Sequence, residues 1–317
     1  VLDPFYIPEN VPTKKVIPYA HVREADVAWS KRIWRVIDLR EKFNHSLYYP
    51  LDEIEGGMWK TNSNAWSLWT IIRAHVMSGD LTLYSPYHPD WEQWRDGDGF
   101  KYPVTPNVPG GNYYNDAAFR ERVDGYLGYV DIDPFAVPIT SIVNFPDDSV
   151  ICKDIRTGEI VSEDRLGEDF IECETQYPPA DTVWYTSKDI IQYRIKEDWF
   201  FDKQQSRQRV RIIAIAPVIY SRDKNGNITG TEELFWLYFP ECRYVFQNFW
   251  VQNRHNTAQM MSFDDLFWKR KFQSYIVKES SLSGREISDY SHGIDALLES
   301  ERIKEKLFIM EHDLWSY

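Results

Sequence analysis

The chain has 317 residues, enough for one large domain or two moderate ones. Its 36 basic and 49 acidic side chains give a formal net charge of −13, which argues against non-specific nucleic-acid binding because that requires a net basic face. No run of about 18 apolar residues occurs, so the sequence predicts no membrane-spanning helix.

Four prolines within the first 20 residues predict an extended arm at residues 1–20, because proline fixes φ and removes a backbone donor. Two alternatives stay open for this arm: it lies across a neighbouring molecule, or it is a floppy terminus. Residues 23–42 then predict one long helix, with apolar side chains at three-and-four spacing on one face and Arg32 and Arg35 on the charged face opposite.

Four elements are predicted between residues 60 and 125. They are a helix from about residue 62 to Gly79, a strand at 81–85, a long Pro-, Gly- and Asp-rich loop at 88–115 and a short helix at 116–123. The loop exceeds the length that compact domains usually contain, which favours a functional role or packing on a partner. Short strands and turns are expected over 136–182, one of them at 149–155.

The C-terminal part contains the clearest strand pair, Arg209–Tyr220 with Glu233–Phe239, joined through a tight turn at Asn225-Gly226. Capped or periodic segments predict helices at 187–201, 240–250, 262–278 and 293–312. The predicted fold class is therefore α+β: several amphipathic helices, small antiparallel sheets that include a hairpin near 209–239, and long Pro/Gly-rich loops. After the arm we expect an N-terminal α+β region at 21–180 and a C-terminal α+β region at 181–317, which together form either two domains or one.

Motifs for metal, nucleotide or nucleophilic chemistry do not occur. The seven histidines form no HxxxH, and GxSxG, Walker A and GxGxxG motifs are missing, so no catalytic residue, metal or cofactor is expected. Asp96-Gly-Asp-Gly99 hints at a calcium loop, but Phe100 takes the third ligand position and a turn is the better interpretation. Cys152 with Cys173 is the more plausible disulfide, with Cys242 left over, and three buried thiols are the alternative.

Aromatic residues make up 16% of the chain, which indicates extensive contact surface with protein partners or with sugar. The enzymatic alternative is glycoside hydrolysis or carbohydrate binding, because Asp90 and Glu92 stand beside Trp91 and Trp94.

Long Trp-rich phrases carry a family resemblance. They are Arg23-Glu-Ala-Asp-Val-Ala-Trp-Ser-Lys-Arg-Ile-Trp-Arg-Val-Ile-Asp-Leu-Arg-Glu-Lys42, Tyr193-Arg-Ile-Lys-Glu-Asp-Trp-Phe-Phe-Asp-Lys203 and Ile287–Lys306 with Glu311-His-Asp-Leu-Trp-Ser-Tyr317. In these phrases the chain resembles the GldN/PorN family of the type IX secretion and gliding machinery. The similarity is strongest over 19–50, 187–240 and 285–317.

The resemblance implies a non-enzymatic periplasmic subunit at the inner face of the outer membrane, needed for protein secretion. Its implied partners are a GldK/PorK-type lipoprotein, neighbouring copies of itself in a ring and the periplasmic domain of a GldM/PorM-type motor component. The family has no recognised catalytic residues, so none is carried over. As partner-binding residues we predict Arg32, Arg35, Trp91, Trp94 and Trp315.

Overall fold

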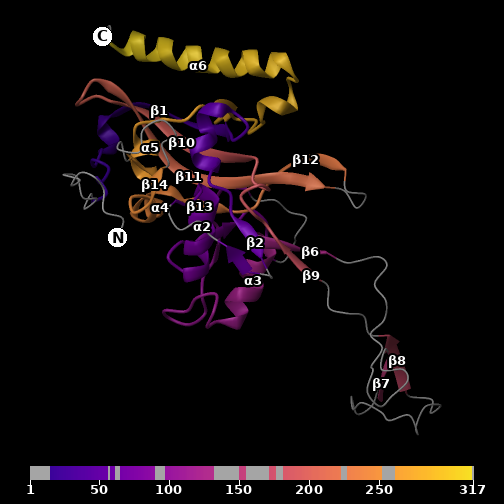
Figure 1. Cartoon of the computed structure of the whole chain (residues 1–317). Helices are drawn as coiled ribbons and strands as arrows, with labels where there is room; N and C mark the ends of the chain where they lie inside the picture. The colour runs from indigo at the N-terminus through magenta and orange to yellow at the C-terminus, as the bar shows by residue number, and fades with distance from the viewer. Residues whose placement is uncertain are drawn as a thin grey trace. The chain divides into compact units, whose positions relative to one another are not determined.

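Eight strands pair into one antiparallel sheet in the larger of two compact units of the chain (Figure 1). The computed structural model describes residues 15–55, 58–60, 65–89, 97–131, 150–154, 171–175, 181–222, 227–251 and 261–315. The larger unit comprises Val1–Leu127 and Tyr185–Tyr317, and the smaller unit comprises Gly128–Trp184.

The sheet runs in the order β16-β1-β10-β11-β13-β4-β5, and β12 also pairs with β11. Its strands are β1 (Val27–Asp38), β4 (Leu83–Ser85), β5 (Tyr102–Val104), β10 (Gln192–Asp202), β11 (Arg207–Arg222), β12 (Ile228–Glu233), β13 (Trp236–Tyr238) and β16 (Tyr275–Glu279). Strands from both sides of residue 180 thus share one sheet. The predicted division into regions 21–180 and 181–317 stays a prediction.

The predicted helix over 23–42 is wrong: a single 3-10 turn, η1 (Glu24–Asp26), leads into the strand β1. The strand lies between β10 and β16 and pairs with both. Ile33 and Ile37, both fully buried, are four residues apart, and residues at that spacing share a face in a strand as well as in a helix. The density of β-branched and aromatic residues in this segment was the signal for the strand.

The predicted helix over 187–201 is also wrong, because this segment contains the strand β10. Gln192–Asp202 pairs along its whole length with β11 on one side and with β1 on the other. The hairpin near 209–239 is confirmed, but the strand that pairs with β11 across the turn is β12, not the predicted Glu233–Phe239. That predicted segment contains β13, which pairs with β11 separately. The turn residues Asn225 and Gly226 lie outside the described residues.

Four of the predicted helices are confirmed with changed bounds, as α2 (Leu68–Ser78), α3 (Ala117–Leu127), α4 (Phe239–Phe246) and α6 (Ile294–Trp315). Ser67 caps α2, and Gly79 ends it with φ of 84°. The predicted caps at 62–64 lie outside the described residues. The predicted helix 262–278 is only partly correct: Ser262 caps the short α5 (Phe263–Trp268), after which β16 joins the sheet.

Small elements complete the larger unit. They are η2 (Lys42–Asn44), α1 (His45–Tyr48), η4 (Ile287–Asp289) and two ladders, β2 (Glu53–Glu55) with β3 (Met58–Lys60) and β14 (Trp250–Val251) with β15 (Met261–Ser262). The strand at 81–85 is confirmed as β4, whereas the predicted loop at 88–115 contains the strand β5. The α+β class is confirmed, in a chain richer in strand than predicted.

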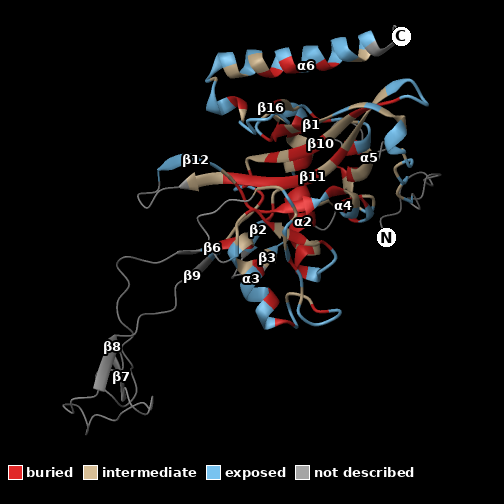
Figure 2. Ribbon diagram, turned by 180° about the vertical axis from the view of Figure 1, so that it is seen from behind, coloured by how far each residue is buried: buried red, intermediate tan, exposed pale blue. Residues whose placement is uncertain are grey.

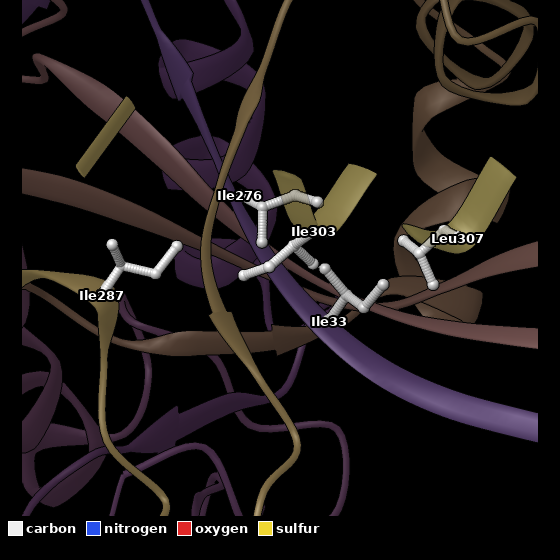
Figure 3. Close-up of a cluster of buried hydrophobic side chains, with 5 residues drawn as sticks. All are labelled: Ile33, Ile276, Ile287, Ile303 and Leu307. Carbon is white, nitrogen blue, oxygen red and sulfur yellow. The ribbon is translucent and has the colours of Figure 1, made fainter. Parts of the chain in front are cut away.

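The C-terminal helix α6 packs on the sheet through a cluster of aliphatic side chains (Figure 3). Ile303 and Leu307, four residues apart on α6, meet Ile33 of β1, Ile276 of β16 and Ile287 of η4. Figure 2 shows the remaining surface of the helix as mostly exposed. Because residues three and four apart share one face of a helix, this narrow stripe holds α6 to the sheet and leaves its other side open.

In the smaller unit, β6 (Gly128–Asp131) pairs with β9 (Asp181–Trp184), and β7 (Val150–Asp154) pairs with β8 (Ile171–Thr175). The strand predicted at 149–155 is confirmed as β7. The ladder places Cys152 opposite Cys173. Opposed residues of an antiparallel pair have Cα atoms about 4.5–5.5 Å apart, within the range that a disulfide requires.

We expect Cys152 and Cys173 to form a disulfide when the chain is made in an oxidising compartment. Two thiols then lose two protons and two electrons to a disulfide-exchange oxidant. Peptide mapping without reductant should find the two cysteine peptides linked, with Cys242, which is fully buried, as a free thiol. Two free thiols at 152 and 173 in protein from such a compartment would contradict the expectation.

Candidate binding surfaces

A loop is anchored to one face of the sheet by Asp98, which is bound by two side chains at once. The indole Nε1 of Trp34 on β1 donates to Asp98 Oδ2 at 2.5 Å, and Lys196 Nζ on β10 lies 2.9 Å from the same oxygen. Lys196 also donates to the backbone carbonyl of Asp98 at 3.1 Å. Trp34 and Lys196 are opposed in the β1–β10 ladder, so their side chains share the face that receives the loop.

Aromatic rings and lysines surround this anchor. Lys196 Nζ lies 5.8 Å from the ring centroid of Trp34 and 5.6 Å from that of Phe100, while Lys278 Nζ lies 5.0 Å from Trp34. Burial acts to raise the pKa of Asp98, but its hydrogen bond and ion pair with Lys196 outweigh burial and hold the pKa below its usual value. The carboxylate is therefore charged and its role here is structural. Asp98 lies in the turn predicted at 96–99, but the sequence of that turn did not predict that Trp34 and Lys196 bind it.

Arg32 and Arg35, predicted to share one charged face, lie on opposite faces of the sheet because they are three residues apart in a strand. Arg32 donates two hydrogen bonds to the carboxylate of Asp198, at 2.6 and 2.9 Å, and 45% of its side chain is exposed. Arg35 is 8% exposed and donates to the hydroxyl and the carbonyl of Ser274. Arg35 thus binds within its own chain, and the partner role of both residues stays a prediction.

The structure describes only one of the three predicted tryptophans. Trp91 and Trp94 lie outside the described residues, as do Asp90 and Glu92 of the carbohydrate hypothesis. Trp315 is the last residue of α6. Their roles stay predictions, and the loop anchored at Asp98 follows directly on the segment that contains Trp91 and Trp94.

Changing Arg32 to alanine is expected to leave stability within about 1 kcal/mol, because exposed ion pairs contribute little. If Arg32 contacts a partner, the same change lowers the amount of partner that co-purifies. Arg23→Ala is a matched control, since Arg23 is exposed and forms an ion pair with Asp26. Co-purification equal to that of the control would remove Arg32 from the interface. Arg35 is unsuitable for this comparison because its replacement disturbs the fold.

The end of the proline-rich arm is held by a ring stack and by two arginines. The ring of Tyr19 stacks on Trp268 at 5.5 Å, and the guanidinium carbons of Arg243 and Arg211 lie 4.7 and 5.1 Å from its centroid. Arg243 is itself bonded to Asp264 at 2.7 Å. Residues 15–23 contain no helix or strand, and residues 1–14 lie outside the described residues.

A groove of about 420 Å³ runs between α6 and the β10–β11 end of the sheet. Its apolar lining consists of Trp199, Leu307 and Phe308, and its acidic lining consists of Glu301, Glu305 and Glu311. Phe308 is 70% exposed. We call this feature the acidic groove. The acidic groove was not predictable from the sequence, because Trp199 lies beside α6 only when residues 192–202 form a strand of the sheet and not the predicted helix.

The residues that the structure describes form no candidate metal centre. Among them, no three His, Cys, Asp or Glu side chains lie close enough to hold a metal ion. Within the same residues, no helix is both long and apolar enough to cross a membrane.

These features define an α+β protein with one central antiparallel sheet, an anchored loop, a half-exposed ion pair and the acidic groove. The chain matches the family of gliding motility associated protein GldN over residues 22–316, and it belongs to that family. The resemblance in its Trp-rich phrases is thereby confirmed. A comparison with curated proteins finds no match.

Proposed function

We propose that the chain is a non-enzymatic structural subunit of a periplasmic ring, built with a GldK/PorK-type lipoprotein at the inner face of the outer membrane. In this role it serves type IX secretion and gliding, and it meets the periplasmic domain of a GldM/PorM-type motor component. The observation that carries the proposal is the family match over nearly the whole chain.

The surfaces support a subunit that contacts several neighbours. A ring requires two different surfaces on each copy, one for each neighbour, because a single self-complementary patch closes a dimer. Arg32 on the sheet and the acidic groove beside α6 are separate surfaces with different charge. Many modest contacts of this kind gain strength when they act together in one assembly.

The test is purification of the tagged chain from gently solubilised outer membranes, followed by negative-stain electron microscopy. Closed rings that contain the chain and a lipoprotein are the expected result. A monomer without partners in the same preparation would refute the proposal. A broad glycan panel then tests the carbohydrate alternative, with Asp90→Asn and Glu92→Gln as the variants that should lose any binding or turnover.

A further inference from the structure

The acidic groove combines an apolar lining with uncompensated negative charge. Lys304, which also lines it, lies 3.4 Å from Glu301 and offsets that one carboxylate. Among the described residues, neither Glu305 nor Glu311 has an ion-pair partner. Phe308 meanwhile exposes most of its ring beside them. The complement to such a groove is a segment in which a large apolar side chain stands next to a lysine or arginine.

The segment Lys15-Val16-Ile17 of this chain has that complementary character. Lys15 is exposed, Val16 is partly buried and Ile17 is 63% exposed. The segment precedes Tyr19, whose stack on Trp268 fixes the position from which it extends. Ile17 and Lys15 are thus exposed next to a residue, Tyr19, that is fixed to the rest of the chain.

We propose that the acidic groove of one copy binds the segment Lys15–Ile17 of a second copy. Ile17 contacts Phe308 and Leu307, and the ammonium of Lys15 lies among Glu301, Glu305 and Glu311. The inference rests on the proposed ring function. Groove and segment are different surfaces of the same chain, so each copy offers one to each neighbour, and such a head-to-tail contact can repeat around a ring.

The chemistry of the groove is tested first with a fluorescent peptide of residues 10–18 and the full chain. We expect saturable binding that Glu301→Lys/Glu305→Lys weakens at least tenfold. Glu121→Lys, at an exposed position of α3, should bind like the unchanged chain. A peptide with glutamate in place of Lys14 and Lys15 should bind the double variant. Such binding would show that the double variant is folded. Absence of binding, or equal binding by the double variant and the control, would overturn the inference.

The identity of the occupant is tested in the purified complex with p-benzoylphenylalanine in place of Phe308. Copies labelled with nitrogen-15 are mixed with unlabelled copies before assembly and irradiation. A mixed-label cross-link from position 308 to residues 14–20 supports a second copy as occupant. A cross-link within one copy, or one to the lipoprotein alone, would overturn it.

The two proposals fail in distinguishable ways. Rings that form without the mixed-label cross-link would overturn the inference and leave the proposed function standing. A mixed-label cross-link between copies that form no ring would support the groove contact while refuting the ring.

Discussion

Replacing Asp52 with alanine is expected to lower the free energy of unfolding by about 3–5 kcal/mol, because it leaves a buried guanidinium without its counter-charge. The side chains of Arg73 and Asp52 are 3% and 1% exposed, and Arg73 Nη1 lies 2.6 Å from Asp52 Oδ2. Burial lowers the pKa of Arg73 to about 10, against the opposing charge of Asp52. Without that carboxylate, the cation–π contact with the Trp59 ring, 4.1 Å from the guanidinium carbon, offsets only part of the cost of burying the charge.

Asp52 also joins two distant parts of the chain. Its Oδ1 accepts a hydrogen bond from the backbone nitrogen of Ser187 at 2.7 Å and another from the Ser187 hydroxyl. Arg73 belongs to α2, and Ser187 stands just before β10. One carboxylate therefore fixes α2 against the approach to the central sheet. Its loss also leaves the backbone N–H of Ser187 without its acceptor, whereas the Ser187 hydroxyl keeps its contact with the Ser67 hydroxyl.

The effect is measured by urea unfolding followed by circular dichroism. Glu53→Ala is the matched control, since Glu53 is the exposed neighbour and should change stability by no more than about 0.5 kcal/mol. Asp52→Asn should lose the charge while keeping an oxygen for Ser187. Adding Arg73→Met to Asp52→Asn should recover part of the loss, because the unpaired charge is then removed. A loss below about 1 kcal/mol in Asp52→Ala would contradict the account.

Several elements were predicted from the capping or turn residues at their ends. Ser67 and Ser262 cap α2 and α5, and Gly79 ends α2 in the left-handed conformation that glycine favours. The hairpin of β11 and β12 followed from a β-branched run and a turn dipeptide. In these places the residues that determine the element lie within the element itself or at its ends.

The central sheet was harder to predict because its strands pair over long sequence distances. Nothing local states that β1 lies between β10 and β16, and the spacing of Ile33 and Ile37 fits a helix and a strand equally well. The candidate surfaces depend on that pairing. Arg32 and Arg35 separate onto two faces only in a strand, and Trp199 reaches α6 only through the sheet. Charge and aromatic content indicated contact surfaces but not which residues form them.

Replacing Asp98 with alanine is expected to lower the free energy of unfolding by about 3 kcal/mol, because Lys196 is then buried without its counter-ion. Lys196 is 6% exposed, and its ion pair with Asp98, together with the Trp34 hydrogen bond, holds the loop to the sheet. The double variant Asp98→Leu/Lys196→Met should recover most of this loss, since apolar groups of similar size replace a buried pair at little cost, and the part that remains is the acceptor lost by the Trp34 indole. A double variant as unstable as Asp98→Ala would contradict this account.

The same pair predicts how stability depends on pH. The pKa of Asp98 is lower in the folded chain than its ordinary value of 3.8, because the effect of Lys196 outweighs that of burial. A carboxyl with a depressed pKa in the folded state contributes stability above its unfolded pKa, and this contribution is lost as the pH falls through the folded pKa. The difference in free energy of unfolding between the unchanged chain and Asp98→Ala should therefore be largest at neutral pH and should decrease below about pH 4. Urea midpoints of both proteins at pH 7 and in steps below pH 4 measure it. A gap that stays constant across that range would mean that the charge of Asp98 does not hold the loop, and that packing of Phe100 and Trp34 does.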